Sequence, residues 1–303
     1  MPERSSRRRV RRGGTTLTAV AVVAGAVLTG CTSSGREGAV PGAAGPRSPS
    51  PSPAWDASPA SVAAVGDSIT RGFDACSVLA DCPEVSWATG TDTAVRSLAV
   101  RLLGASKAPA HSWNHAVSGA RMAQLPEQMA LAAKEDPALV TVMIGANDAC
   151  RDSVRLMTPV ADFRVSFEAA VRRLRATAPK AQLYVSSVPD LKRLWSAGRV
   201  NPLGKQIWKL GICRSMLGDA DDMGAAAVAR REAVRDRVVA YNEVLRDVCA
   251  RDELCRDDRG AVFAYRFTGK QLSEWDWFHP GRNGQARLAE IAYREVTASR
   301  PPA

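Results

Sequence analysis

Leu139–Ile144 reads LVTVMI, a continuous and largely apolar run of six residues in which four side chains are β-branched. Such a run is short for a helix and predicts a strand that is buried on both faces of a sheet. Ser61–Val65 (SVAAV) and Ala181–Val188 (AQLYVSSV) predict two more strands of this kind. Weaker runs at Trp113–Val117 and Ala261–Tyr265 bring the number of expected strands to five.

Amphipathic segments separate these expected strands. Their apolar residues recur at helical spacing, as at Phe163, Phe167 and Leu174. Helices are therefore expected over residues 94–103, 121–134, 159–178, 228–249 and 285–297. Residues 190–226 show no clear pattern. Strands that alternate with helices of this length favour a parallel sheet with helices on both faces, so we expect one three-layer α/β/α domain over residues 61–300.

The composition is that of an ordinary globular protein. Of the 303 residues, 46% are hydrophobic and 24% are charged, which excludes a fully disordered or fibrous chain. The formal net charge is +10, but half of this excess lies in residues 1–30, which hold six arginines and one glutamate. The remaining residues carry 35 basic and 30 acidic side chains, a surplus too small to predict a nucleic-acid-binding surface.

Residues 1–30 have the organisation of an export signal. Arg7–Arg12 is a basic stretch, and Ala19–Leu28 (AVAVVAGAVL) is an apolar run of ten residues. A transmembrane helix needs about 20 apolar residues, so this run matches the core of a signal peptide better. The segment Leu28-Thr29-Gly30-Cys31 resembles a bacterial lipobox. This resemblance implies cleavage before Cys31 and attachment of a lipid to its sulfur.

Residues 31–60 are rich in Gly, Pro, Ser and Ala and contain one aromatic residue, Trp55. This composition buries too little apolar surface to fold, so we expect a tether between a lipid anchor and the folded domain. The expected location is the outer face of the bacterial cell membrane. The alternative is ordinary secretory cleavage with an incidental Cys31, which would give a secreted protein.

Six cysteines remain besides Cys31, and an even number in an exported protein predicts disulfides. They are Cys76, Cys82, Cys150, Cys213, Cys249 and Cys255. The pairs 76–82 and 249–255 would close local loops and leave Cys150 for Cys213, although six cysteines allow many other pairings. A zinc site is the alternative, but the chain has three histidines and no CxxC pair.

Four motifs lie where an α/β protein places its functional residues, at the carboxyl ends of strands or before the last helix. They are Gly66-Asp67-Ser68-Ile69-Thr70, Ser118-Gly119-Ala120-Arg121, Gly145-Ala146-Asn147-Asp148 and Asp276-Trp277-Phe278-His279-Pro280. In this order they resemble the motifs of the SGNH, or GDSL-type, hydrolase family. The resemblance implies a flavodoxin-like fold with a mainly parallel five-stranded sheet. Ser86–Gly90 and Leu125–Gln128 are similar to the phospholipase B branch of that family.

The resemblance implies an acyl-serine mechanism that requires no metal or cofactor. Ser68 is assigned as the nucleophile, His279 as the base and Asp276 as the acid that orients the imidazole, with Glu274 as a substitute candidate. The backbone N–H groups of Ser68 and Gly119 and the side-chain amide of Asn147 are assigned to the oxyanion hole.

We therefore expect a monomeric serine esterase or lipase that cleaves carboxylic esters. The expected substrate is a small-molecule or lipid ester, and the phospholipase B-like segments favour lysophospholipids. The membrane is an expected partner through the lipid anchor, and nucleic acid is not. The alternatives are a carbohydrate O-acetyl esterase or an acyltransferase on the same fold, and a non-catalytic binding lipoprotein.

Overall fold

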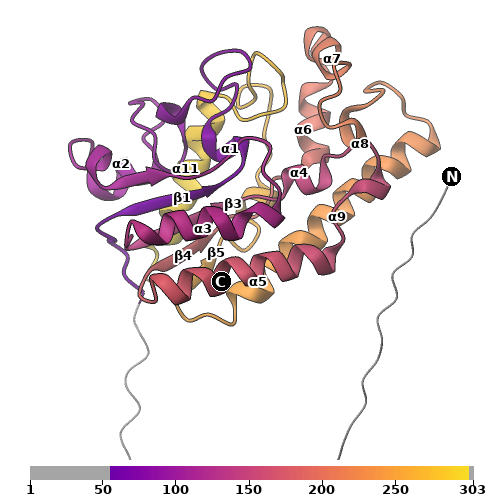
Figure 1. Cartoon of the computed structure of the whole chain (residues 1–303). Coiled ribbons are helices and arrows are strands. Elements are labelled where there is room, and N and C mark those ends of the chain that lie inside the picture. The colour runs from indigo at the N-terminus through magenta and orange to yellow at the C-terminus, as the bar shows by residue number, and fades with distance from the viewer. Residues whose placement is uncertain (1–54, 300–303) are drawn as a thin grey trace, which may run out of the picture. The chain divides into compact units, whose positions relative to one another are not determined.

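The computed structural model describes residues 55–299, which carry one mixed α/β fold (Figure 1). Cys31, the expected signal peptide and most of the expected tether lie outside the described residues. The sheet in this part of the chain has five strands: β1 (Val62–Gly66), β2 (Ser112–Asn114), β3 (Leu139–Met143), β4 (Gln182–Val185) and β5 (Cys255–Asp257). Their order is β2-β1-β3-β4-β5, and every neighbouring pair is parallel. This is the flavodoxin-like order, so the predicted fold class is confirmed.

The central strands are the most deeply buried part of the sheet. All residues of β1, β3 and β4 are buried. In the register of the central pair, Val62 lies opposite Leu139 and Gly66 lies opposite Met143. The two strands therefore end together, and the loops that follow them start side by side.

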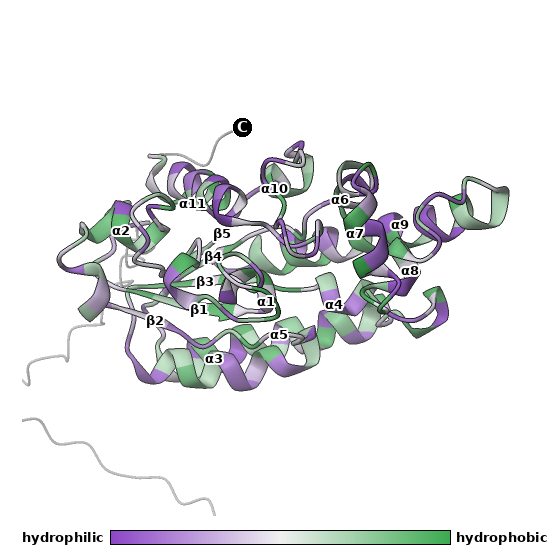
Figure 2. Cartoon of the chain, turned by 90° about the horizontal axis from the view of Figure 1, so that it is seen from above, coloured by the Kyte–Doolittle hydropathy of each residue, from purple (hydrophilic) through white to green (hydrophobic). Residues whose placement is uncertain are grey.

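Helices cover both faces of the sheet (Figure 2). On one face lie α3 (Leu125–Lys134) and α5 (Val160–Thr177), and on the other lie α2 (Leu98–Leu103) and α11 (Arg282–Thr297). The long helix α9 (Ala225–Cys249) packs against α5. The expected three-layer arrangement is therefore confirmed.

The predicted fifth strand is wrong. Residues Ala261–Ala264 form the short helix α10, and the edge strand β5 lies just before it. The Asp258 carboxylate accepts hydrogen bonds from the N–H groups of Gly260 and Val262 at 2.9 and 3.0 Å. These bonds, together with the left-handed φ of 81° at Gly260, turn the chain out of the sheet. A short apolar run does not by itself distinguish a strand from a buried helical turn.

The segment without a clear sequence pattern forms three helices. These are α6 (Leu191–Gly198), α7 (Pro202–Trp208) and α8 (Arg214–Leu217). Asp190 caps α6 by accepting hydrogen bonds from the N–H groups of Lys192 and Arg193. In Figure 1 the three helices lie at the upper right of the fold, next to α4 (Ala146–Ala149). Four 3-10 helices complete the described part: Pro83–Val85, Ala108–Ala110, Met122–Gln124 and Val154–Leu156.

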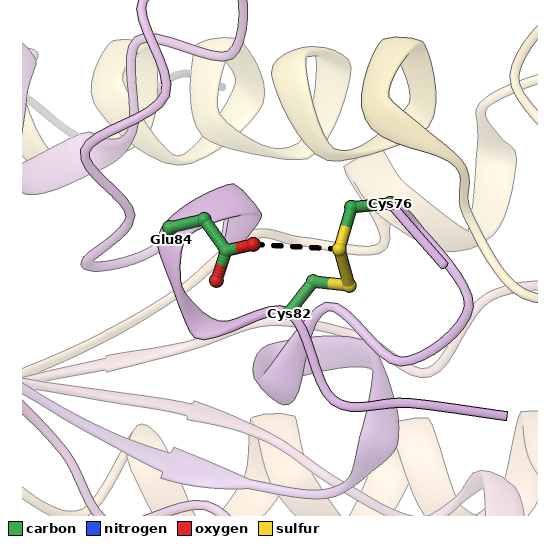
Figure 3. Close-up of side chains that lie close together, drawn as sticks. All are labelled: Cys76, Cys82 and Glu84. Atoms are coloured by element: carbon green, nitrogen blue, oxygen red, sulfur yellow. Dashed lines mark hydrogen bonds between the residues drawn. A yellow bond between two sulfur atoms is a disulfide. The ribbon is translucent and has the colours of Figure 1, made fainter. Parts of the chain in front are cut away.

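The six cysteines form the three disulfides that the spacing favoured. The bonded pairs are Cys76–Cys82, Cys150–Cys213 and Cys249–Cys255. Cys76 and Cys82 lie close to Glu84, in a group whose ligand atoms are near enough together to hold a metal (Figure 3). The sulfurs of Cys76 and Cys82 are bonded to each other, so neither is a thiolate that could bind zinc. The disulfides therefore argue against the alternative of a zinc site built from these cysteines.

The packed part of the chain begins before the predicted boundary at Ser61. Trp55 donates a hydrogen bond from Nε1 to the carbonyl of Val296 at 2.8 Å, and its ring lies 4.4 Å from the Arg256 guanidinium carbon. The indole thus attaches the end of the expected tether to the domain. Between residues 55 and 299, no helix combines the length and apolar character that a bilayer span requires.

Candidate active site

Ser68 is the first residue of the short helix α1 (Ser68–Arg71), which starts directly after β1. Asp67 caps this helix, because its Oδ1 accepts a hydrogen bond from the Ile69 N–H at 3.0 Å. The Ser68 residue is 7% exposed. The end of β1 and the cap together hold the hydroxyl at the carboxyl edge of the sheet, where α/β proteins bind their ligands.

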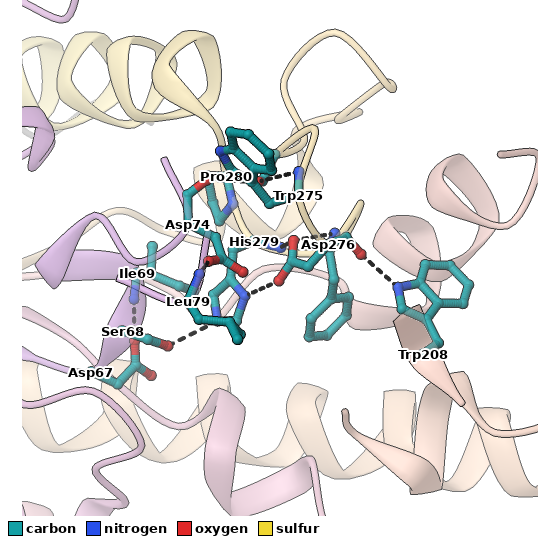
Figure 4. A network of polar contacts seen from close by, with 12 residues as sticks. Asp67, Ser68, Ile69, Asp74, Leu79, Trp208, Trp275, Asp276, His279 and Pro280 are labelled. Carbon is teal, nitrogen blue, oxygen red and sulfur yellow. Dashed lines mark hydrogen bonds and ion pairs between the residues drawn. The ribbon is translucent and has the colours of Figure 1, made fainter. Parts of the chain in front are cut away.

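The three residues assigned to the triad, Ser68, His279 and Asp276, form one hydrogen-bonded chain (Figure 4). Ser68 Oγ lies 3.0 Å from His279 Nε2, and His279 Nδ1 lies 2.5 Å from Asp276 Oδ2. Asp276 Oδ1 also accepts the backbone N–H groups of Phe278 and His279, each at 2.9 Å. The loop that carries His279 therefore also fixes the Asp276 carboxylate. Only the contact between Ser68 and His279 depends on the packing of distant segments.

The charges and hydrogen bonds around His279 favour the protonated form of its imidazole. Burial by itself would lower the pKa of His279, but the charge and hydrogen bond of Asp276, and the charges of Asp74 and Asp67, raise the pKa above its ordinary value. Burial opposes ionisation of Asp276, but His279 and the hydrogen bonds described above hold the pKa of Asp276 below its ordinary value. Protonation of the imidazole is thus assisted, which is what a general base at this position requires.

The predicted oxyanion donors lie in the loops after β1, β2 and β3. Asn147, in α4, donates one amide hydrogen to the Ala120 carbonyl at 3.0 Å, which leaves the other amide hydrogen available. Gly119 has a left-handed φ of 81°, a conformation that glycine adopts without strain. Within residues 55–299, the N–H groups of Ser68 and Gly119 make no hydrogen bond to the protein. Three donors are therefore free for a ligand at this edge.

Two buried glutamines hold the site, and the sequence analysis did not single them out as site residues. Gln285 of α11 accepts the Trp87 N–H at 2.9 Å and donates to the Ile69 carbonyl at 2.9 Å. Gln128 of α3 accepts the Gly66 N–H at 2.7 Å and donates to the Gly66 carbonyl at 3.0 Å. Gln128 ends the segment Leu125–Gln128 that resembles the phospholipase B branch, which is the one local signal for it. Gln285 looks like an ordinary polar residue of an amphipathic helix, so no local signal separates it from a surface glutamine.

A cavity of about 230 Å³ opens beside Ser68 and His279. Its other walls are largely apolar: Ile69, Ala146, Cys150, Leu191, Leu194, Ile212, Cys213, Phe278 and Pro280, with Asn147 as a further polar group. Much of this lining comes from α6 and from the segment before α8, and the Cys150–Cys213 disulfide joins that segment to the loop after α4. Trp208 of α7 donates to the Asp276 carbonyl at 2.7 Å (Figure 4), so this region also supports the loop of His279.

Two further buried carboxyls lie under the site. Burial raises the pKa of Asp67 to about 7 and also raises the pKa of Asp148. Asp148 Oδ2 accepts the Met122 N–H at 2.8 Å, and Asp67 caps α1. Both side chains therefore bond loop backbone beside the proposed oxyanion donors.

A family model described as the GDSL-like lipase/acylhydrolase family matches residues 64–287. The chain belongs to this family. The match contains all four sequence motifs and nearly the whole sheet, and it makes the protein a carboxylic ester hydrolase.

Solved structures of similar fold include three with low sequence identity to this GDSL-like hydrolase. A GDSL-like lipase from Parabacteroides merdae is 16% identical, with a TM-score of 0.47 over 82% of this chain and 100% of the other. An extracellular lipase from Streptomyces rimosus is 17% identical, with a TM-score of 0.46 over 78% and 99%. A family two carbohydrate esterase from Clostridium thermocellum is 17% identical, with a TM-score of 0.49 over 78% and 63%. No curated protein matched the chain.

Proposed function

We propose that Ser68, His279 and Asp276 are the catalytic triad of this carboxylic ester hydrolase. The observation that carries the proposal is the unbroken chain of contacts from Ser68 Oγ through both ring nitrogens of His279 to the Asp276 carboxylate. The nucleophile and its base are within hydrogen-bond reach, and a third group orients the base. The non-catalytic binding lipoprotein is disfavoured, because such a protein has no need of this alignment.

In the proposed reaction, Ser68 Oγ attacks the ester carbonyl carbon while its proton passes to His279 Nε2. Asp276 stabilises the imidazolium that forms. The carbonyl oxygen becomes an oxyanion and accepts hydrogen bonds from the N–H groups of Ser68 and Gly119 and the amide of Asn147. Collapse of this intermediate releases the alcohol, which takes the proton from His279. Water, activated by His279, then hydrolyses the acyl-Ser68 ester to the carboxylic acid.

The cavity supports an apolar acyl group of modest size as the substrate. Its volume of about 230 Å³ is smaller than the roughly 300–1,000 Å³ of pockets that take drug-sized ligands. Its walls are hydrophobic beside the polar Ser68, Asn147 and His279, which suits an acyl chain longer than acetyl. We therefore propose short- or medium-chain carboxylic esters, including lipid esters with acyl chains of that length, ahead of carbohydrate acetyl esters and of long-chain lysophospholipids.

A panel of p-nitrophenyl esters from acetate to palmitate tests this substrate range. We expect kcat/KM to rise from acetate to a medium-chain ester and then to fall. Ile212→Trp should fill part of the cavity and lower kcat/KM for the octanoate by about tenfold, since one or two methylenes in an apolar pocket are worth roughly 1–3 kcal/mol, while the acetate is still hydrolysed.

Leu210→Trp is the matched control, because Leu210 is 80% exposed and does not line the cavity. It should leave the chain-length profile unchanged. A profile that peaks at acetate in the wild type, or one that Ile212→Trp leaves unaltered, would contradict the proposed acyl site and favour an O-acetyl esterase.

The lipobox-like segment supports a further proposal about location. We expect lipidation of Cys31 to hold the enzyme on the outer face of the cell membrane. Expressed in a bacterial host, the full chain should partition into detergent on phase separation and incorporate labelled fatty acid, and Cys31→Ser should lose both properties while the ester hydrolase activity is kept. Incorporation of label by Cys31→Ser would contradict the proposal.

A further inference from the structure

Asp74 is a second carboxyl beside the Asp276–His279 pair, and the proposed mechanism does not use it. It lies in the loop after α1, and its residue is 2% exposed. An oxygen of Asp74, an oxygen of Asp276 and a ring nitrogen of His279 all lie within 4.8 Å of one another (Figure 4). The side chain of the preceding residue, Phe73, packs edge-on against the His279 ring, with 5.1 Å between ring centres.

The loop is built to hold the Asp74 carboxyl in this position. Asp74 has a left-handed φ of 56°, a conformation that aspartate adopts more readily than most residues because its side chain can bond to nearby backbone. Its Oδ1 accepts the Leu79 N–H at 2.5 Å, and its own N–H donates to the Ala80 carbonyl at 3.0 Å. The Cys76–Cys82 disulfide closes the same loop.

The loop is also attached to the segment that carries His279. Ser273 Oγ donates to the Asp74 carbonyl at 2.6 Å, and the Ser273 N–H donates to the His279 carbonyl at 2.8 Å. Asp74 and His279 are therefore joined through one residue, and their relative position does not depend on exposed side chains.

We propose that Asp74 is a positioning residue of the triad: a second buried carboxyl behind the Asp276–His279 pair that adds to the electrostatic stabilisation of the imidazolium. The proposal rests on the proposed function, since it concerns the proton that His279 receives from Ser68. Asp74 acts through His279 and Asp276 and does not touch the ester.

The charged groups around His279 are acids. Asp276, Asp74 and Asp67 act on the imidazole, and Asp148 in turn acts on Asp67. Among the described residues, no lysine or arginine forms an ion pair with Asp67, Asp74 or Asp276. The negative charge of Asp74, when present, is therefore not neutralised by a basic side chain in direct contact.

The negative charge of Asp74 depends on pH. Burial and the neighbouring Asp276 raise the pKa of Asp74 to about 6. Below that pH the neutral carboxyl can donate a hydrogen bond to Asp276, and above it the anion favours a proton on His279. Because a negative neighbour raises the pKa of a histidine, removal of the Asp74 charge must lower the pKa of His279.

The test is the pH dependence of kcat/KM for Asp74→Asn, which keeps the size of the side chain and an acceptor for the Leu79 N–H. We expect the acid limb of the profile to move to lower pH by about one unit and the plateau to fall by roughly tenfold. Glu84→Gln is the matched control: it also removes one carboxylate, at an exposed position beside the same disulfide (Figure 3), and should leave the acid limb in place. An unchanged acid limb in Asp74→Asn overturns the proposal.

An NMR titration of the His279 ring in the wild type and in Asp74→Asn provides a second readout, and the same spectra show whether the variant is folded. We expect the pKa of His279 to be lower in Asp74→Asn than in the wild type, because the variant lacks the negative neighbour. An unchanged pKa of His279 in the folded variant overturns the proposal. If the proposed triad were wrong, Ser68→Ala would still hydrolyse the ester. If only the role of Asp74 were wrong, Ser68→Ala would be inactive and the pH profile of Asp74→Asn would be unshifted.

Discussion

Ser68→Ala is expected to lower kcat by about 10⁴- to 10⁶-fold and to leave the melting temperature within a few degrees of wild type. The hydroxyl is the atom that forms the acyl-enzyme, so the remaining oxyanion donors can act only on a direct attack by water. Stability should be kept because alanine is favourable in a helix, and the Asp67 cap that starts α1 uses a carboxylate and a backbone N–H. Initial rates with a p-nitrophenyl ester and a thermal melt measure both quantities.

A fluorophosphonate probe provides the control for this variant. It should add one phosphonyl group to Ser68 of the wild type and none to Ser68→Ala. Ser112→Ala, in β2 and away from the cavity, should be labelled like the wild type. Wild-type turnover by Ser68→Ala, or labelling of another residue, would remove Ser68 from the mechanism. A wild-type protein that neither takes the label nor hydrolyses the ester would revive the binding-lipoprotein alternative.

Asp276→Asn is expected to lower kcat by about 10⁴-fold with little loss of structure. Asparagine keeps an oxygen for the N–H groups of Phe278 and His279, and places an amide NH₂ where Oδ2 faces His279 Nδ1. An NH₂ group there favours the tautomer whose proton sits on Nε2. That nitrogen then cannot accept the proton of Ser68.

Glu274→Gln is the matched control, since it removes an exposed carboxylate two residues earlier in the same loop. We expect its kcat to equal that of the wild type. If Glu274→Gln lost activity and Asp276→Asn kept it, the acid of the triad would be Glu274, the other acid near His279 in the sequence. Kinetics of both variants at a pH above the acid limb decide between the two carboxylates.

Several features that residue type and spacing predicted correctly are local ones, whereas the grouping of Ser68 with His279 came from the family resemblance and the Cys150–Cys213 pair was left after the two local cysteine pairs. A continuous apolar run such as Leu139–Ile144 by itself predicts a buried strand. Asp276 and His279 lie three residues apart in one loop, so the carboxylate can reach the imidazole through local chain geometry. Two of the disulfides, Cys76–Cys82 and Cys249–Cys255, also close short loops. Each of these features is decided by neighbours along the chain, so residue type and spacing were sufficient.

The tertiary structure alone decided how these local pieces meet. Asp74, Gln285 and the cavity wall at Leu194 and Ile212 have no local signal that marks them as parts of a site. Asp74 meets Ser273 across 199 residues of chain, and Gln285 meets Ile69 across 216. Such contacts form only when separate segments pack on the same sheet, because burial and the hydrogen bonds it enforces depend on the whole fold. A short sequence pattern therefore does not predict these long-range contacts.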